Sequence, residues 1–171
     1  MKKIKILSAW FLALALFASC SDEFEDNLVK DNLPEIPVTY AGATTAGFNP
    51  YYSVQYAGTS TPIQIVLSIP SDASLQIKEV TKMIAGATAI NAGNLTAATQ
   101  ANYLSAPIAV NGFTATINTT IGEFNTKVPA SARITAAPAA GTFTERAFMF
   151  LLTMQDDSQI IPVQCRIRVT P

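Results

Sequence analysis

The sequence Arg146-Ala147-Phe148-Met149-Phe150-Leu151-Leu152-Thr153-Met154 predicts the central strand of a β-sheet. Its apolar run, Ala147–Leu152, would place apolar side chains on both faces of a strand, as in a strand that is covered on each side. The polar residues Gln155–Ser158 predict a turn, after which the chain returns as a second strand over Ile160–Thr170. Pro162 cannot donate to a β-ladder and marks an edge or a bulge there. The side chains expected to point inward alternate along this return strand: Val163, Cys165, Ile167 and Val169.

The same period of two recurs toward the N-terminus and predicts further strands. The clearest is Thr61–Ile69, and weaker patterns lie at Pro37–Tyr40 and Tyr51–Ala57. The connection Pro70–Ser74 has the length of a hairpin turn. The segment Leu75–Ile84 fits both a helical spacing and a strand, and we interpret it as a bulged strand. One face of the clearest strand is wholly apolar: Ile63, Ile65, Leu67 and Ile69.

The middle of the chain combines loops with one hairpin signal. Asn111-Gly112 lies between the runs Tyr103–Val110 and Phe113–Ile121, and this dipeptide favours the type I′ turn of a β-hairpin. Ala85–Ala101 predicts a long surface loop with one helical turn around Leu95–Ala101. Gly122–Thr142 predicts a second loop region around one short run, Ala132–Ala136.

About seven strands and no long helix indicate an all-β fold, an antiparallel β-sandwich of the immunoglobulin-like type. A jelly roll or a small barrel is the alternative architecture. The chain lacks the Cys…Trp…Cys core of antibody domains, because its one tryptophan, Trp10, lies near the N-terminus. The sequence therefore predicts a sandwich that is not a true antibody-type domain.

The N-terminus has the organisation of an export signal. Lys2, Lys3 and Lys5 precede an apolar run, Ile6–Ala18, which is shorter than the roughly 18 to 20 residues that cross a bilayer as a helix. The end of this run and the two residues after it, Phe17-Ala18-Ser19-Cys20, resemble the lipobox of bacterial lipoproteins, with Phe where that family prefers Leu. The resemblance implies a diacylglycerol on the Cys20 thiol and removal of residues 1–19. Ordinary signal cleavage near Ala18 is the alternative.

The acidic stretch Ser21-Asp22-Glu23-Phe24-Glu25-Asp26 resembles the signal that sends Bacteroidota lipoproteins to the outer face of the outer membrane. A periplasmic lipoprotein with an acidic linker is the alternative. Low hydrophobicity and like charges favour a flexible tether. We therefore divide the chain into a lipoprotein signal peptide (1–19), an acidic flexible tether (20–36) and a β-sandwich domain (37–171).

Charge and composition argue against several classes of function. Seven Lys/Arg against six Asp/Glu from Pro37 onward give a charge of +1, without the clustered basic face that nucleic acids require. The chain has no histidine, so Cys165 lacks the usual base and is interpreted as a small buried hydrophobe. No zinc-ligand spacing or phosphate loop occurs. We therefore expect a protein that is not an enzyme, with no metal and no cofactor apart from the lipid on Cys20.

Two binding roles are left open. As a whole the chain resembles the small accessory lipoproteins that accompany outer-membrane nutrient-uptake systems in Bacteroidota. That resemblance implies an accessory or assembly subunit of an envelope complex, with protein partners and with Ala147–Leu152 as a docking surface if it is not simply buried. A glycan-binding surface lipoprotein is the alternative. Its candidate sugar-stacking residues are Tyr51, Tyr52, Tyr56 and Tyr103.

Overall fold

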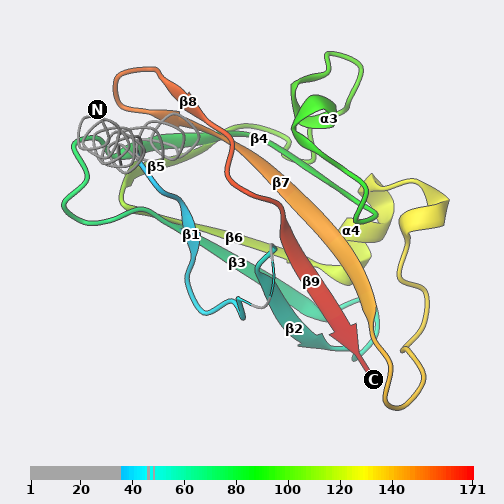
Figure 1. Cartoon of the computed structure of the whole chain (residues 1–171). Helices are drawn as coiled ribbons and strands as arrows, with labels where there is room; N and C mark the ends of the chain where they lie inside the picture. The colour runs from blue at the N-terminus through cyan, green and yellow to red at the C-terminus, as the bar shows by residue number, and fades with distance from the viewer. Residues whose placement is uncertain (1–35, 46, 48) are drawn as a thin grey trace, which may run out of the picture. The chain divides into compact units, whose positions relative to one another are not determined.

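The computed structural model describes residues 36–45, 47 and 49–171, and these form two β-sheets (Figure 1). The predicted β-rich class is confirmed for this part of the chain. The predicted signal peptide, Cys20 and nearly all of the acidic tether lie outside the described residues. Sheet A has the order β1 (Thr39–Tyr40), β3 (Pro62–Ser68) and β6 (Thr114–Thr120). Sheet B has the order β2 (Tyr51–Gln55), β9 (Cys165–Thr170), β7 (Thr144–Met154), β4 (Ile77–Gly86) and β5 (Ile108–Gly112), and β8 (Gln159–Ile160) also pairs with β7.

Strand β7 lies between β9 and β4, which confirms its prediction as a central strand. Its side chains Phe148, Phe150 and Leu152 are buried in the core. The apolar faces of β3, β6 and β9 contribute to the same core. All named strand pairs are antiparallel except β2 with β9, which are parallel. The alternating pattern therefore predicted the core faces of these strands correctly.

A second, smaller cluster covers the other face of β7. Met149 on β7 and Ile84 on β4 pack with Leu95, which is fully buried in the short helix α3 (Ala92–Thr96). Asn91 caps this helix by accepting a hydrogen bond from the Asn94 N–H. Burial of the Ala147–Leu152 run on both faces therefore explains its apolar character. The predicted helical turn exists, but it begins at Ala92 rather than at Leu95.

The predicted hairpin at Asn111-Gly112 is wrong. Strand β5 pairs with β4 in sheet B, whereas β6 pairs with β3 in sheet A, so the chain changes sheets at Phe113. A type I′ turn needs positive φ at both central residues, and only Asn111 has it, at 51°. The connection Pro70–Ser74 also joins different sheets, because β3 and β4 do not pair. Alternation predicts which side chains point inward, but it does not say which sheet a strand joins.

The bulged strand predicted over Leu75–Ile84 is confirmed, since β4 shows two shifts of register. The return strand is interrupted at Pro162, where an edge or a bulge is predicted: residues 161–164 divide it into β8 and β9. Val163, expected to face inward, is 56% exposed, and its carbonyl accepts a hydrogen bond from the Tyr40 hydroxyl. Pro162 has no N–H for the ladder, which accounts for the break.

The segment 122–142 holds helices that the sequence interpretation missed. α4 (Ile121–Lys127) begins where β6 ends, and the Thr120 side chain caps it by accepting from the Glu123 N–H. A 3₁₀ turn, η1 (Ala130–Ala132), ends at the first residue of the short run expected over Ala132–Ala136. The spacing Thr-x-x-Glu is the sequence signature of such a helix start and could have predicted α4.

Candidate binding pocket at the sheet edges

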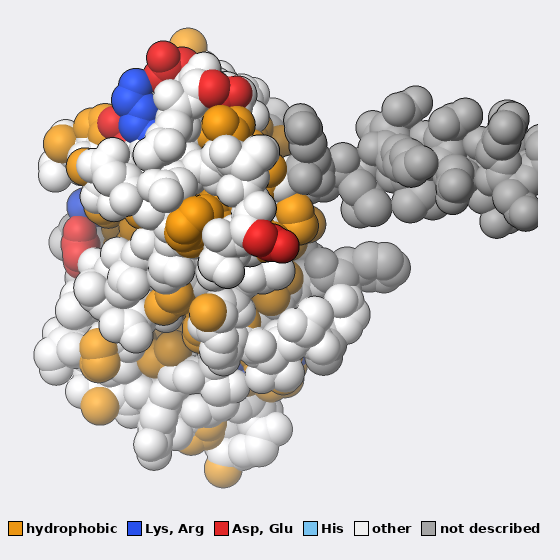
Figure 2. Space-filling view, turned by 90° about the vertical axis from the view of Figure 1, so that its left-hand side faces the viewer, with side chains coloured by type: hydrophobic (Ala, Val, Ile, Leu, Met, Phe, Trp, Pro, Cys, Tyr) orange, Lys and Arg blue, Asp and Glu red, His pale blue; other side chains and the backbone are white. Residues whose placement is uncertain are grey.

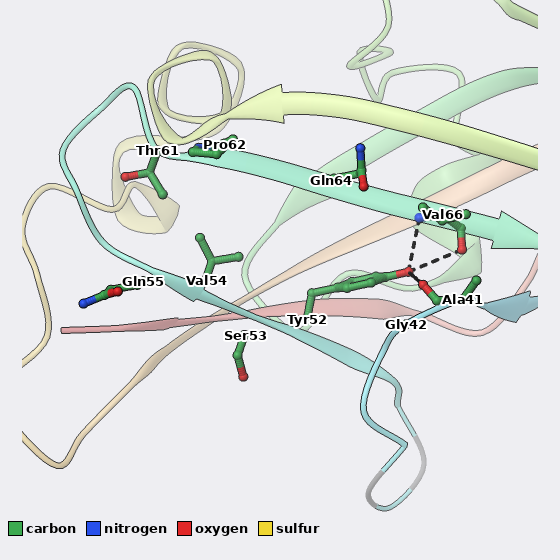
Figure 3. A pocket seen from close by; sticks show the side chains of 10 residues that line it. All are labelled: Ala41, Gly42, Tyr52, Ser53, Val54, Gln55, Thr61, Pro62, Gln64 and Val66. Atoms are coloured by element: carbon green, nitrogen blue, oxygen red, sulfur yellow. Dashed lines mark hydrogen bonds between the residues drawn. The ribbon is translucent and has the colours of Figure 1, made fainter.

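A pocket of about 460 Å³ lies where the edges of the two sheets approach each other (Figure 3). Strand β2 is one of the two edge strands of sheet B. Strand β1 covers only one end of β3, with Thr39 opposite Ser68 and Tyr40 opposite Leu67. We call the space between β2 and the uncovered part of β3 the edge pocket. Its lining residues are Ala41, Gly42, Tyr52, Ser53, Val54, Gln55, Thr61, Pro62, Gln64 and Val66.

The outer edge of β2 is open beyond its first residue. The Tyr56 N–H donates to the Thr170 carbonyl at 2.9 Å, so even-numbered residues of β2 bond toward β9. The odd-numbered residues face the other way, as the mutual hydrogen bonds of Tyr51 and Thr44 at 2.8 and 3.0 Å show. By the period of two, the main-chain groups of Ser53 and Gln55 point outward as well. In the described part of the sheet no strand lies beyond them.

Tyr52 closes the equivalent edge of β3. The Ala41 N–H donates to the Val66 carbonyl at 2.9 Å, and the chain then turns away at Gly42, whose φ is +80°. The Val66 N–H instead donates to the Tyr52 hydroxyl at 3.1 Å. This hydroxyl in turn donates toward the carbonyls of Ala41 at 2.8 Å and Val66 at 3.3 Å. Burial is the main cause that raises the pKa of Tyr52. Tyr52 therefore takes the place of a missing strand at this point (Figure 3).

Two polar side chains of the edge pocket already have partners. The Thr61 hydroxyl donates to the Gly58 carbonyl and accepts from the Ala57 N–H, both at 2.7 Å. The Gln64 amide donates to the Asn118 side chain at 3.0 Å, across the outer face of sheet A. The groups that remain for a ligand are the exposed side chains of Ser53 and Gln55 and the main-chain groups of the β2 edge. Main-chain groups of an open strand edge suit an extended peptide, which can pair with them as an added strand.

The structure does not gather the four predicted tyrosines into one platform. Tyr52 in β2 and Tyr56, the residue after this strand, both pack against the core. Tyr103 is only 5% exposed, and its ring packs edge-on against Phe148 with centroids 6.0 Å apart. Burial raises the pKa of Tyr103 to about 12. Tyr51 points to the opposite face of β2, so only Tyr52 lines the edge pocket.

The outer face of sheet B carries a paired group of charges that the sequence interpretation did not single out. The Glu145 carboxylate bonds to both Arg166, at 3.2 Å, and Arg168, at 2.9 Å. The Arg168 guanidinium also lies between the rings of Tyr51, at 3.9 Å, and Phe143, at 4.0 Å. Alternating Arg residues in β9 hinted at this outward face. We call these five residues the arginine stack, in which one carboxylate pairs with two guanidinium groups.

Charge is absent from a large part of the folded sequence. Residues 37–71 and 83–122 contain no Asp, Glu, Lys or Arg, so β1, β2, β3, β5 and β6 are uncharged. Figure 2 shows a face of the domain on which most charged side chains lie toward the upper half. We call sheet A together with β2 the uncharged side. The two uncharged segments were visible in the sequence, but only the strand order shows that they meet in space.

Cys165 and the acidic side chains were the remaining candidates for catalysis or metal binding. Cys165 is a free thiol without exposure, and burial raises its pKa to about 12, which fits its interpretation as a buried hydrophobe. Within residues 36–171, where they are described, no three His, Cys, Asp or Glu side chains gather as metal ligands would. None of the helices in that same part has the length and apolar character needed to cross a membrane.

Three comparisons, with protein-family models, with curated proteins and with solved structures, find no match for this chain. The edge pocket and the uncharged side are therefore the features from which a function can be inferred.

Proposed function

We propose that this chain is a non-enzymatic lipoprotein, anchored in the outer membrane through Cys20, that serves as an accessory or assembly subunit of an envelope complex of the nutrient-uptake type. The proposed address at the cell surface rests on Phe17-Ala18-Ser19-Cys20 and the acidic residues after it. The proposed role rests on one structural observation, the uncharged side with its open β2 edge.

We further propose that the domain is an immunoglobulin-like sandwich. The order β1-β3-β6 against β2-β9-β7-β4-β5 supports this architecture, because β3 and β6 pair in one sheet while β4, β7 and β9 pair in the other. The parallel pair β2–β9 fits a first strand that is divided between two sheets. A fold of this kind supplies rigid edges and faces for binding.

Contact with another protein explains why the uncharged side lacks charge. The cores of protein–protein interfaces are depleted of charged residues, since each buried charge must be desolvated. Free surfaces of monomeric proteins usually mix both signs of charge, which keeps them soluble. The outer face of sheet A instead presents amide and hydroxyl groups that can pair with a partner at little desolvation cost. Its exposed members are Gln64, Thr114, Thr116 and Asn118.

The acidic side chains of the domain support a non-enzymatic role, because most of them already bond to other groups of the domain. Glu145 joins the arginine stack, Glu123 bonds to Lys127 at 2.7 Å, and Asp157 bonds to Lys78 at 2.5 Å. Asp156 accepts from the backbone N–H and the hydroxyl of Ser158, and these bonds lower its pKa. Carboxylates in such turns and ion pairs are ordinary structural groups.

The proposed role is tested by recovering partners of the full-length lipidated protein from detergent-solubilised outer membranes. The informative variant is Thr116→Lys, which adds a charge to the exposed face of sheet A. The matched control is Ala140→Lys, which adds the same charge in the exposed connection before β7. We expect a defined envelope protein to copurify with the native chain and the control, and about tenfold less of it with Thr116→Lys. Equal recovery with both variants would contradict a role for the uncharged side.

Glycan binding is the second candidate, and the Tyr52 ring beside the edge pocket is the observation in its favour. Calorimetry with neutral oligosaccharides distinguishes the two roles. Heat of binding that is lost in a Tyr52→Ala variant, without any copurifying protein, would replace the accessory role by this one.

A further inference from the structure

We infer that the arginine stack on the outer face of sheet B is a binding site for uronic-acid saccharides, in which a sugar carboxylate bonds to Arg166 and Arg168 and a sugar ring packs against Phe143. The stack is separate from the edge pocket and from the uncharged side, so the inference goes beyond the proposed function. It combines a surplus of positive charge, free hydrogen-bond donors and an exposed aromatic ring.

The arginine stack holds one more positive charge than negative charge. Glu145 bonds to both arginines, and among the described residues it is the only carboxylate that forms an ion pair with an arginine. The side chains of Arg166 and Arg168 are each only 28% exposed. Partly buried charges are usually paired, because burial removes the water that would otherwise solvate them. Two guanidinium groups that share a single carboxylate therefore leave one positive charge for a second anion.

Each guanidinium keeps one terminal nitrogen that has no partner in the part of the chain that the structure describes. Arg168 donates to Glu145 through Nε, at 3.2 Å, and through Nη2, at 2.9 Å, which leaves Nη1. Arg166 donates through Nε to Gln164 and through Nη1 to Glu145, which leaves Nη2. Ser53 lies opposite Arg168 in the pair β2–β9 and adds an exposed hydroxyl. These are the donors that a carboxylate and a neighbouring sugar hydroxyl require.

Stacking holds Arg168 in place before a ligand arrives. Its guanidinium carbon lies 3.9 Å from the centroid of the Tyr51 ring and 4.0 Å from that of the Phe143 ring. A guanidinium that is already fixed loses little conformational freedom when it binds an anion, which favours affinity. Phe143 itself is 50% exposed, so its ring offers an apolar surface beside the charge.

An acidic saccharide fits this arrangement better than other anions. An oligouronate carries a carboxylate on every ring, so one ring can cover Phe143 while the carboxylate of the next ring reaches the arginines. The planar guanidinium group matches a carboxylate, and the flat C–H face of a sugar ring packs well on an aromatic ring. An inorganic anion would leave Phe143 exposed. An acidic peptide holds its carboxylates on flexible side chains and lacks a comparable flat apolar face.

The first experiment measures saccharide binding by calorimetry with the full-length protein solubilised in detergent. The probe is tetragalacturonate, and its methyl-esterified form is the control, because it has the same rings without the negative charges. We expect binding of the acid, at least tenfold weaker binding of the ester, and a several-fold loss of affinity for the acid at about 1 M salt, where charges are screened. A tetraglutamate peptide, which has the charges without the rings, should also bind at least tenfold more weakly.

The second experiment locates the site with variants whose fold is checked by circular dichroism. Arg168→Gln should weaken binding of tetragalacturonate about tenfold, and Phe143→Ala about fivefold. The matched control is Arg133→Gln, which removes the same charge from an exposed arginine outside the stack and should bind as the native chain does. Glu145→Gln should instead bind the acid several-fold more tightly, because a carboxylate no longer competes for the guanidinium groups. A stack with a purely structural role would not show this gain.

Absence of binding by tetragalacturonate, equal affinity for its ester or for the peptide, or equal affinity of Arg168→Gln and Arg133→Gln would overturn the inference. Tyr52→Ala, which changes the edge pocket, should leave this binding unchanged, and a loss there would assign the saccharide to the edge pocket instead. The proposed function is tested separately by recovery of partners with Thr116→Lys, so failure of one proposal is distinguishable from failure of the other.

Discussion

The outer faces of the two sheets differ in how much of each is covered and in the charge that each carries. In sheet B, α3 covers one part of the outer face, and the arginine stack pairs one carboxylate with two arginines on another part. Sheet A buries only its inner face and leaves the outer one exposed and free of charge. The strands that carry charged side chains, β4, β7 and β9, each have a neighbouring strand on both sides. The strands at the sheet edges carry no charged side chain. The comparison indicates that sheet B provides stability and that the uncharged side is available for contact.

The largest effect is expected from a change at the centre of sheet B. Phe148 is fully buried and packs edge-on against Phe124, with ring centroids 5.6 Å apart. Phe148→Ala should lower the free energy of unfolding by about 3 to 5 kcal/mol, because it removes contacts and leaves a cavity. The measurement is urea unfolding followed by circular dichroism. Thr116→Ala on sheet A is the control and should stay within about 0.5 kcal/mol of the native chain.

A smaller effect is expected where α3 covers sheet B. Leu95 is fully buried, but its cluster holds only two other fully enclosed residues, Ile84 and Met149. Leu95→Ala should therefore cost about 2 kcal/mol, at the low end of leucine truncations, since a small cluster can relax around the change. Urea unfolding measures it, with Val163→Ala, at an exposed side chain, as the control. A loss no larger than the control's would mean that α3 does not stabilise this face.

Core faces were predictable from the sequence because alternation reports burial directly. Both faces of Ala147–Leu152 and the inner faces of β3 and β6 follow from side-chain period alone. The partner of each strand was not predictable in the same way. Asn111-Gly112 has the composition of a hairpin turn, yet the chain crosses between sheets there, because pairing depends on contacts far apart in the sequence.

The edge pocket was even harder to predict from the sequence than the strand pairing. Tyr52 was a candidate for sugar stacking, whereas its hydroxyl completes the edge of β3 at Val66. That role depends on where β1 ends and on how closely β2 approaches, and neither is encoded in local pattern. The uncharged segments 37–71 and 83–122 were readable, but their meeting on one side required the strand order.

A third and smaller change in the free energy of unfolding, about 1 kcal/mol, is expected from a substitution in the arginine stack. Glu145 bonds two arginines and its side chain is 20% exposed, so the pairs are partly screened by solvent. Glu145→Gln should lower the free energy of unfolding by about 1 kcal/mol at low salt, and by less at 1 M salt, where charges are screened. Chemical unfolding in urea at both salt concentrations measures this. An equal loss at both would show that packing, and not charge, holds the stack.

The smallest effect concerns the acidic group nearest to sheet A. Glu123 follows β6 in α4, bonds to Lys127 at 2.7 Å and accepts from the Thr119 hydroxyl at 2.8 Å. These contacts, the Lys127 bond first, lower the pKa of Glu123 below its ordinary value of 4.5. A carboxylate with a lowered pKa stabilises the folded state above its ordinary pKa, and this contribution is lost as the pH falls through the lower, folded value.

The native chain should therefore lose stability on acidification below about pH 4.5 more steeply than a Glu123→Gln variant, which cannot titrate at this position. The difference in unfolding midpoint between the two chains, measured in urea from pH 7 to pH 3, should shrink toward the acid end. Ala140→Glu serves as a control for an added exposed carboxylate, and it should show no such convergence. Parallel curves for the native chain and Glu123→Gln would mean that the ion pair does not tie α4 to the end of β6. In that case packing around the fully buried Phe124 would hold α4 at the end of β6.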